Sequence, residues 1–387
     1  MKLVKLAEKL VSFNTVSQKS STREIADFVS NYCENAGFIV EQYPYKNNKE
    51  GLEKVNVIVR KGGKKSKLCL SGHMDTVPFN PNDWNTNPLK LTKMGDKYYG
   101  MGITDMKLFL AIAMKAGEEV SEHELKYPFS LCFTSDEEVG CLGARKLTRK
   151  NVQIADLIII GEPTEMTPLN LHEGYIFLRI KLKGKTGHAS DPKKGASVVE
   201  LALIQVLQKL FEFKNILSEI IDKRFYPPYP TMNIGVVTTD NQESGKKSAK
   251  NLIADFCKIE LEIRPLPGQD SKELHHILKQ IITKEISTIK NIDVQIEFGR
   301  APTPPMETDE KSEIAIAING VSGKEMQSVC FNTEGGVFNE HGAQTIIWGP
   351  GSIQQAHKPR EFVDIKYFQP KIINQYIRLI KGICCRR

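Results

Sequence analysis

One apolar stretch of the chain ends in a histidine and an aspartate two positions apart. The stretch LCLSGHMD covers residues 68–75 and places His73 and Asp75 after its apolar part. Side chains two positions apart on a strand point to the same side, so one ring nitrogen of His73 is expected to donate to the Asp75 carboxylate. The other nitrogen then remains free to bind a metal ion. A polar pair that only closes the end of a strand is the alternative.

Acidic side chains follow two more apolar stretches. PFSLCFTSDEE ends in Glu137 and Glu138, and LIIIGEP places Glu162 directly after its apolar residues. In an open α/β sheet the carboxyl ends of the strands share one crevice, so these acids are expected to lie near His73. Crowded carboxylates repel one another and take up protons unless a cation lies among them. The pattern therefore predicts a cation site.

Two further residues belong to this predicted site. In YYGMGITDMK, Gly100 and Gly102 allow a tight turn that brings Asp105 to the crevice. His357, in GPGSIQQAHKPRE, follows the late apolar stretch TIIW. The two glycines also match part of a dinucleotide-binding loop, but Asp105 would repel a pyrophosphate there. A solvated loop side chain is the alternative for each residue taken alone.

The predicted set of ligands contains two histidines and three carboxylates. Such a set suits two Zn²⁺ ions per chain, about 3.5 Å apart, that share one carboxylate, with Co²⁺ as a substitute. The ions lower the pKa of a bound water and polarise a carbonyl. One acid must stay free to take the proton of the water, and the neighbours Glu137 and Glu138 can divide these two roles.

The elements that must position these residues alternate between strands and helices. In the first 176 residues, helical patterns such as MKLFLAIAMKAGEEV separate VNVIV and the three stretches above. Near the end of the chain, TIIWGPG has the same pattern of an apolar strand. Strands buried on both faces predict an α/β fold with a largely parallel, layered catalytic domain.

Between these parts the pattern changes to strand, helix, two strands, helix and strand. This order predicts an inserted ferredoxin-like α+β domain, and the proline-rich APTPP at 301–305 marks the return to the first domain. We therefore expect an α/β domain at residues 1–176 and 300–387 and an inserted domain at residues 177–299.

The composition limits the class of protein. The chain has 387 residues, of which 40% are hydrophobic and 26% charged. This length predicts two domains, and this composition excludes a disordered chain and a polytopic membrane protein. The net charge of +7 is spread without a basic stripe. We therefore expect no nucleic-acid partner and no membrane partner, and a small acidic substrate is favoured.

The two ends of the chain carry further expectations. MKLVKLAEKLVSF has the apolar spacing of an amphipathic helix, and its lysines interrupt the apolar core that a signal peptide needs. We expect a packed helix and a cytoplasmic protein. The eight cysteines have no regular spacing, which predicts no disulfide framework. The pair Cys384 and Cys385 is expected to lie in a disordered terminus, with metal binding or oxidation as alternatives.

The motifs from SGHMDTVP to QQAHKPRE resemble those of a family of two-zinc amidohydrolases and exopeptidases, and the resemblance covers almost the whole chain. This family includes acetylornithine deacetylases, succinyl-diaminopimelate desuccinylases, aminoacylases and glutamate carboxypeptidases. The resemblance implies that one zinc is bound by His73, Asp105 and Glu162. The ligands that it implies for the other zinc are Asp105, Glu138 and His357.

The same resemblance implies roles for five more residues. Asp75 would orient a histidine ligand, and Glu137 would be the general base and later the general acid. The inserted domain would form a homodimer, in which His188 of GKTGHASDP stabilises an oxyanion in the partner's active site. Asn251 and Arg264 would contact the substrate, with Arg264 holding a carboxylate. A loop histidine that caps a helix and a surface arginine are the alternatives.

Within the family, GPGSIQQAHKPRE looks most like the acetylornithine deacetylases. The resemblance implies hydrolysis of an N-acyl amino acid, first of all N2-acetyl-L-ornithine, as in arginine biosynthesis. Leu108 after Lys107, and the glycine pair in NTEGG at 332–336, depart from the family pattern and bear on the acyl specificity. The alternatives are succinyl-diaminopimelate desuccinylation, general deacylase or dipeptidase activity, and a catalytically silent metal-binding scaffold.

Overall fold

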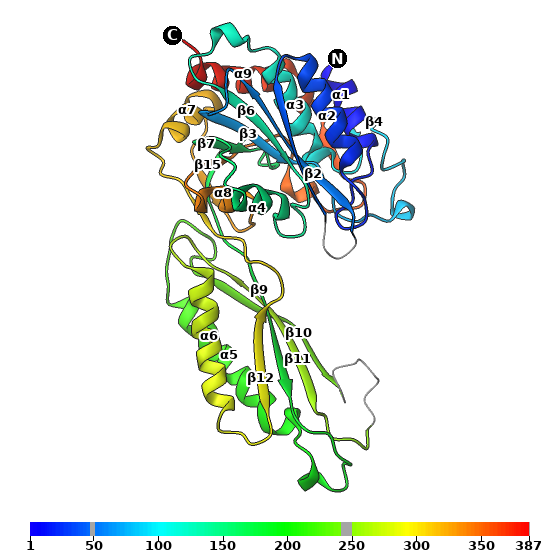
Figure 1. Cartoon of the computed structure of the whole chain (residues 1–387), viewed down its shortest axis with the longest axis vertical. Helices are drawn as coiled ribbons and strands as arrows, with labels where there is room; N and C mark the ends of the chain where they lie inside the picture. The colour runs from blue at the N-terminus through cyan, green and yellow to red at the C-terminus, as the bar shows by residue number, and fades with distance from the viewer. Residues whose placement is uncertain (47–50, 241–249, 387) are drawn as a thin grey trace. The chain divides into compact units, whose positions relative to one another are not determined.

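The computed structural model describes residues 1–46, 51–240 and 250–386, and the chain forms two compact units (Figure 1). The first unit comprises Met1–Leu171, Met306–Ser328 and Thr333–Arg387, and the second comprises His172–Pro305 and Val329–Asn332. The structural boundaries lie at 171/172 and 305/306, whereas 176/177 and 299/300 were expected. Tyr175 and Thr303 lie just outside the expected insertion and pair with each other in a β-bridge. Both residues therefore belong to the second unit.

The first unit is built on a mixed sheet. In spatial order, its strands are β1 (Ile39–Lys46), β2 (Glu53–Lys61), β6 (Phe129–Thr134), β3 (Leu68–His73), β7 (Leu157–Ile160), β15 (Gln344–Ile347), β8 (Leu169–His172) and β13 (Met306–Glu307), with β14 (Gln327–Val329) beside β8. A smaller sheet contains β16 (Phe362–Asp364), β5 (Lys97–Tyr99) and β4 (Thr92–Met94). The helices are α1 (Leu3–Ser12), α2 (Arg23–Asn35), α3 (Leu108–Glu118), α4 (Leu142–Arg149), α7 (Glu313–Ser322), α8 (Gly335–Glu340) and α9 (Pro370–Cys384).

The predicted α/β fold class is confirmed, with one correction to the sheet. The strands β6, β3, β7 and β15 are parallel to one another. The strands β1 and β2 run antiparallel beside β6, and β8 runs antiparallel to β15. The sheet is therefore parallel only in its centre. A short connection suffices between antiparallel neighbours such as β1 and β2, whereas the parallel strands need crossovers.

Helices cover both faces of this sheet, and strand β2 shows why. Its residues Val55, Val57 and Val59 belong to the main hydrophobic core, together with residues of α1, α2, α3 and α9. Asn56 points to the other face, where its side-chain amide donates to the Gly143 carbonyl of α4 at 2.9 Å. The period of two thus separates an apolar face from a face with polar contacts.

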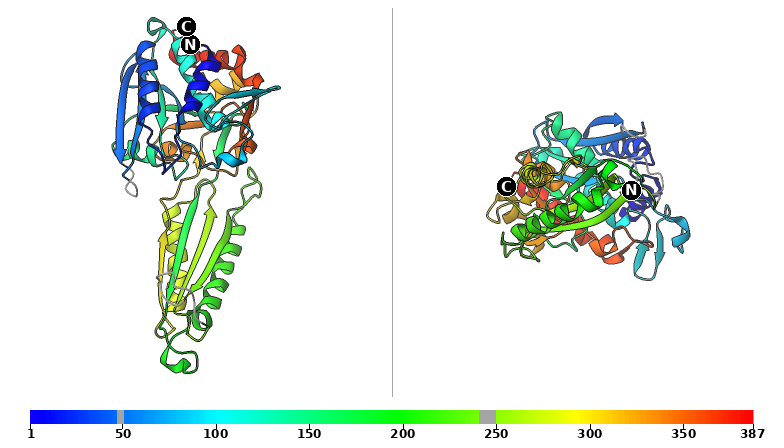
Figure 2. Two further views of the ribbon diagram at one scale, coloured as in Figure 1. Left: turned by 90° about the vertical axis from the view of Figure 1, so that its right-hand side faces the viewer. Right: turned by 90° about the horizontal axis from the view of Figure 1, so that it is seen from below.

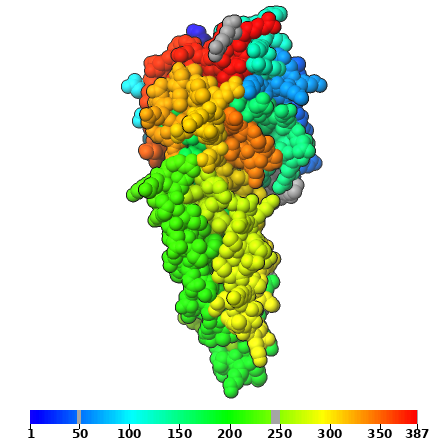
Figure 3. Space-filling view, turned by 90° about the vertical axis from the view of Figure 1, so that its left-hand side faces the viewer, coloured from blue at the N-terminus to red at the C-terminus, as the bar shows by residue number. Residues whose placement is uncertain are grey.

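The second unit has the predicted ferredoxin-like order. Its elements are β9 (Ile176–Lys183), α5 (Ile204–Ser218), β10 (Thr231–Asp240), β11 (Phe256–Arg264), α6 (Ser271–Ile286) and β12 (Asp293–Phe298). The strands form an antiparallel sheet in the order β10-β11-β9-β12. The helices α5 and α6 pack on one face of this sheet (Figure 2) and lie side by side at the surface (Figure 3).

The two ends of the chain give one confirmation and one correction. Helix α1 buries Leu3, Leu6, Ala7, Leu10 and Val11, as its spacing predicts. The expected disorder at Cys384 and Cys385 is wrong. Cys384 is buried at the end of α9, and its carbonyl accepts hydrogen bonds from the amides of residues 126 and 127. All eight cysteines, which lie in the described ranges, are free thiols. None of the helices in the described ranges has the length and apolar character of a membrane span.

Candidate metal centre

The predicted ligands lie at one edge of the first unit's sheet. His73 ends β3, Glu138 follows β6, and Glu162 follows β7. These three strands are neighbours and parallel, so their carboxyl ends open on the same side. Asp105 comes from the irregular turn Ile103–Lys107, and His357 follows the short helix Ile353–Gln355. The structure therefore brings together all five residues that were expected to bind metal.

These five residues form two ligand groups that share Asp105. One group is His73, Asp105 and Glu162, and the other is Asp105, Glu138 and His357, with the ligand atoms of each group within 4.8 Å of one another. Nε2 of His73 lies 2.9 Å from Oδ1 of Asp105, and Nε2 of His357 lies 3.2 Å from Oδ2. The two oxygens of one carboxylate thus face different histidines, which is the arrangement of a bridging ligand.

Asp105 is held in place by a carboxylate that was not predicted. The Glu361 side chain is buried and accepts hydrogen bonds from the amides of Gly102, Thr104 and Asp105, at 2.9, 2.7 and 3.0 Å. Gly102 has a φ of +72°, and a Cβ atom there would lie 2.6 Å from the Thr76 side chain. The turn therefore needs a glycine, as expected, and it also needs Glu361 to satisfy its amides.

The charges of the site fit divalent ions. Burial and the charge of Asp105 raise the pKa of Glu162 well above its usual value, and the same causes raise the pKa of Glu138. The hydrogen bonds to Asp105 and Glu138 raise the pKa of His357 to about 11. A set of buried acids that takes up protons in this way is stabilised by cations, and imidazole and carboxylate are the donors that zinc prefers.

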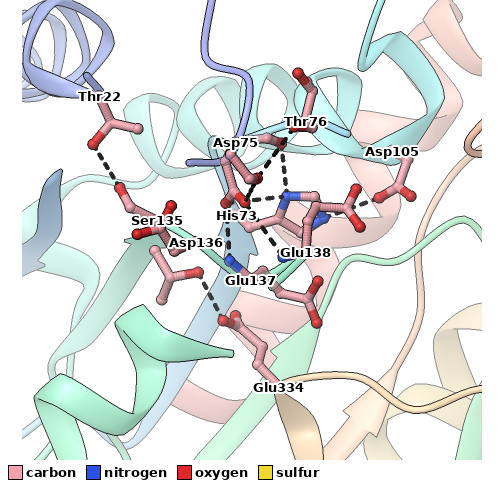
Figure 4. A network of polar contacts seen from close by, with 12 residues as sticks. Thr22, His73, Asp75, Thr76, Asp105, Ser135, Asp136, Glu137, Glu138 and Glu334 are labelled. Carbon is pink, nitrogen blue, oxygen red and sulfur yellow. Dashed lines mark hydrogen bonds and ion pairs between the residues drawn. The ribbon is translucent and has the colours of Figure 1, made fainter. Parts of the chain in front are cut away.

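Asp75 does not bind His73 in the predicted way. Nδ1 of His73 donates to the backbone carbonyl of Asp75 at 3.0 Å, whereas the nearer carboxylate oxygen is 3.7 Å away. That carboxylate accepts hydrogen bonds from the amides of Glu137 and Glu138 at 3.1 and 3.3 Å (Figure 4) and from the Ser17 hydroxyl. Asp75 lies outside β3, so the alternation of a strand does not apply to it. It orients the turn that carries both glutamates.

Glu137 lies beside the ligands without belonging to either ligand group. Burial raises its pKa to about 8, and the charges of Glu138, Asp75 and Glu334 act in the same direction while His73 opposes them. The Cys141 thiol donates to its Oε1 at 3.3 Å. In its ionised form, a carboxylate with a raised pKa is a stronger base than a free one, and Glu137 has no ligand role that would occupy its oxygens.

Glu334 is a second residue of the site that sequence reasoning missed. Its buried carboxylate accepts hydrogen bonds from the hydroxyls of Ser71 on β3 and Thr134 on β6, at 2.8 and 2.7 Å. Figure 4 shows it close to Glu137. Glu334 lies in NTEGG, in which only the glycine pair departs from the family pattern. A single acid in a loop has no apolar periodicity around it that would indicate a buried position.

A buried ion pair supports the turn that precedes Glu137. Nζ of Lys54 lies 2.8 Å from Oδ1 of Asp136, and both side chains are 0% exposed. This pair has no signal in the sequence, because Lys54 stands in an apolar strand pattern.

Replacing Lys54 with methionine is expected to lower the free energy of unfolding by about 3–5 kcal/mol, because Asp136 would keep a buried, uncompensated charge. Urea denaturation of the metal-free protein measures this change. Lys5→Met, which removes the exposed pair of Lys5 with Glu8, is the control and should change little. Equal effects of the two substitutions would contradict the prediction.

The other predicted site residues lie in the second unit. His188 is exposed, and its Nδ1 lies 2.7 Å from the Ser190 hydroxyl. Asn251 is exposed, and its carbonyl accepts from the Ala189 amide at 2.8 Å. Arg264 ends β11 and donates to the side chain of Asn332 at 3.2 Å. His188 and Asn251 are thus brought together in the second unit, and their predicted roles in catalysis and substrate binding stay predictions.

The peptidase family M20/M25/M40 matches residues 69–381. The chain belongs to this family. The acetylornithine deacetylase of Proteus mirabilis (strain HI4320) is 30% identical over 381 residues, which are 98% of this chain and 95% of that protein. The predicted family resemblance is therefore confirmed, and the chain is a metal-dependent hydrolase.

Solved structures of this family share the fold. A tripeptidase from Staphylococcus aureus has a TM-score of 0.73 and 19% identity, and the match covers 99% of this chain and 98% of that chain. A dinuclear metal-binding peptidase of the M20 family from Bacillus subtilis has a TM-score of 0.66 and 14% identity, with 98% and 97% covered. At these identities the comparison concerns the fold alone.

Proposed function

We propose that the chain is a zinc-dependent amidohydrolase that removes the acyl group of an N-acyl amino acid, and that its main substrate is N2-acetyl-L-ornithine. The products are L-ornithine and acetate, as in arginine biosynthesis. The observation that carries this proposal is the pair of ligand groups that share Asp105, with Glu137 beside them. The similarity to acetylornithine deacetylases supports the choice of substrate.

The first unit would carry out the catalysis. His73, Asp105 and Glu162 would hold one Zn²⁺, and Asp105, Glu138 and His357 would hold the other. When bound, the two ions lower the pKa of a water and polarise the acyl carbonyl. Glu137 would take a proton from the attacking water and later give it to the nitrogen of the leaving amine. Asp75 holds the backbone of Glu137 in position for both transfers.

A small cavity beside His357 supports a short acyl group. Its volume is about 150 Å³, and its walls include Trp84, Met101, Phe79 and Val77. Pockets for drug-sized ligands occupy roughly 300–1,000 Å³. The cavity thus favours acetyl over long acyl chains.

The second unit would form a homodimer, in which His188 donates to the oxyanion in the partner's active site. Its edge strand β10 exposes Val236 and Val237, and α5 exposes Ile204, Phe211 and Ile216. Exposed apolar side chains and an edge strand that pairs on one side only, among the described residues, support an interface there. Light scattering should give twice the mass of the 43.5 kDa chain. A monomer at micromolar concentration would contradict this part of the proposal.

A cytoplasmic location belongs to the same proposal. It is supported by the eight free thiols, because cysteines stay reduced in the cytoplasm. Fractionation of cells that express the protein tests the location, and recovery from an oxidising compartment would contradict it.

The substrate is tested by measuring kcat/KM on a panel of acylated amino acids. The purified, zinc-loaded protein is assayed with N2-acetyl-L-ornithine, N-acetyl-L-methionine, N-succinyl-L,L-diaminopimelate and a dipeptide. We expect N2-acetyl-L-ornithine to have the highest kcat/KM. Preference for the succinylated substrate or the dipeptide would favour those activities instead, and no turnover of any substrate would favour a silent scaffold.

A further inference from the structure

A cavity in the first unit lies apart from the metal centre. Its volume is about 580 Å³, which falls in the range of roughly 300–1,000 Å³ that small-molecule sites occupy. Its walls come from the first half of α9 (Figure 1), from the turn before this helix, and from Glu165 and Met166. Among the described residues, none of the five proposed metal ligands lines it. The proposed catalysis therefore makes no use of this cavity.

The base of the cavity is apolar and fixed. Met166, Tyr367 and Ile372 line it with exposed fractions of 7%, 5% and 5%. All three belong to the main hydrophobic core of the first unit. Because close-packed core side chains keep their positions, the cavity is formed before any ligand binds. Its apolar base favours a ligand with an apolar body.

Cationic side chains surround this apolar base. Lys366, Lys371 and Arg378 line the cavity, and Glu165 is the one acid among its described wall residues. Lys371 and Arg378 are about two turns apart on α9, so they lie on the same face of the helix. Lys366 lies 3.6 Å from the Asp364 carboxylate, whereas the side chains of Lys371 and Arg378 form no ion pair or hydrogen bond with the described residues. Two cations are thus available for an anionic ligand.

We propose that this cavity binds a small organic phosphate, namely a phosphate monoester with an apolar or aromatic body. The three cations and Glu165 leave an excess of two positive charges, and a phosphate monoester carries about −1.5 to −2 at neutral pH. The Arg378 guanidinium can hold two phosphate oxygens at once, and Lys371 supplies a point charge. The apolar body would cover Met166 and Ile372. This inference does not rest on the proposed function.

The wall formed by Glu165 and Met166 is connected to two metal-binding segments. These residues follow the ligand Glu162 directly after Thr164, and both have a positive φ, of 55° and 57°. Their amides donate to carbonyls of the segment 349–351 at 2.7 and 2.9 Å, in the stretch that leads to His357. A ligand in the cavity would therefore contact a wall that both segments share, without contacting a metal ligand.

The test measures the binding of phenyl phosphate to the full-length, zinc-loaded protein by isothermal titration calorimetry. We expect phenyl phosphate to bind at least about 10-fold more tightly than inorganic phosphate, because its ring covers the apolar base. It should also bind more tightly than benzoate, which carries a single charge. Equal affinity for phenyl phosphate and inorganic phosphate would overturn the role of the apolar base, and equal affinity for benzoate would overturn the choice of a phosphate.

Two variants and a control locate the bound ligand. Lys371→Ala and Arg378→Ala should each weaken the binding of phenyl phosphate by about 10-fold or more, since each removes a charged partner. Both side chains are exposed and alanine favours a helix, so the fold of α9 is kept. Lys93→Ala, at an exposed lysine of β4 in the same unit, should leave the affinity unchanged.

The outcomes for this site are independent of the enzyme's substrate. Loss of binding in both α9 variants would support the inference even in a protein that hydrolyses no acylated amino acid. Equal affinities in Lys371→Ala, Arg378→Ala and Lys93→Ala would place phenyl phosphate elsewhere and overturn it. Competitive inhibition of hydrolysis with a Ki equal to the measured Kd would place the ligand at the metal centre, which would also overturn it.

Discussion

Replacing Glu137 with glutamine is expected to lower kcat by about 1,000-fold while two metal ions per chain remain bound. Glutamine has the same shape as glutamate but cannot take a proton from water or return it to the leaving amine. Glu137 is outside both ligand groups, so the substitution leaves every proposed metal ligand in place. The Glu137 amide, which donates to Asp75, is unchanged by the substitution.

Three measurements separate this role from a structural one. The metal content of the variant, its kcat and its KM are compared with those of the wild type and of Glu119→Gln, an exposed acid in the same unit. The control should match the wild type in all three. A variant with normal turnover would show that another group is the base, and a variant that loses metal would place Glu137 among the ligands.

The positions of the ligands at the strand ends could be predicted, because a polar residue after a short apolar stretch marks the end of a buried strand. His73, Glu138 and Glu162 each follow a buried strand, and parallel strands bring such positions to one edge whatever the rest of the fold does. The order of elements in the second unit was equally readable, since its strands and helices have clear apolar periodicity. The division into two ligand groups depended on the family resemblance, because Asp105 and His357 do not directly follow a strand.

The residues that support these ligands could not be predicted. Glu361 acts on backbone amides 256 to 259 residues away in the chain, and Glu334 accepts from hydroxyls on two strands. Such contacts depend on tertiary packing and leave no local period. The predicted hydrogen bond from His73 to the Asp75 carboxylate was wrong for a related reason: β3 ends at His73, the alternation of the strand stops there, and the Asp75 backbone carbonyl accepts instead.

Replacing Asp105 with asparagine is expected to remove both metal ions and therefore nearly all activity. Asp105 is the one residue common to the two ligand groups, and each of its oxygens faces a different histidine. Asparagine keeps the shape of the side chain but offers one neutral carbonyl oxygen in place of two charged ones. The loss of metal affinity should exceed the roughly 10- to 100-fold loss that follows removal of an outer partner of a ligand.

Metal content and thermal unfolding both test this prediction without relying on activity. Zinc that binds only the folded state raises the Tm of the wild type, and Asp105→Asn should lose this increase because it lacks the bridging group. Asp96→Asn, an exposed aspartate of the same unit, should keep both the metal and the increase in Tm. Two tightly bound ions in Asp105→Asn would mean that the two groups do not share a ligand. Burial and the charge of Asp105 raise the pKa values of Glu138 and Glu162. In that case the ions that offset this repulsion would have to be bound without a shared carboxylate.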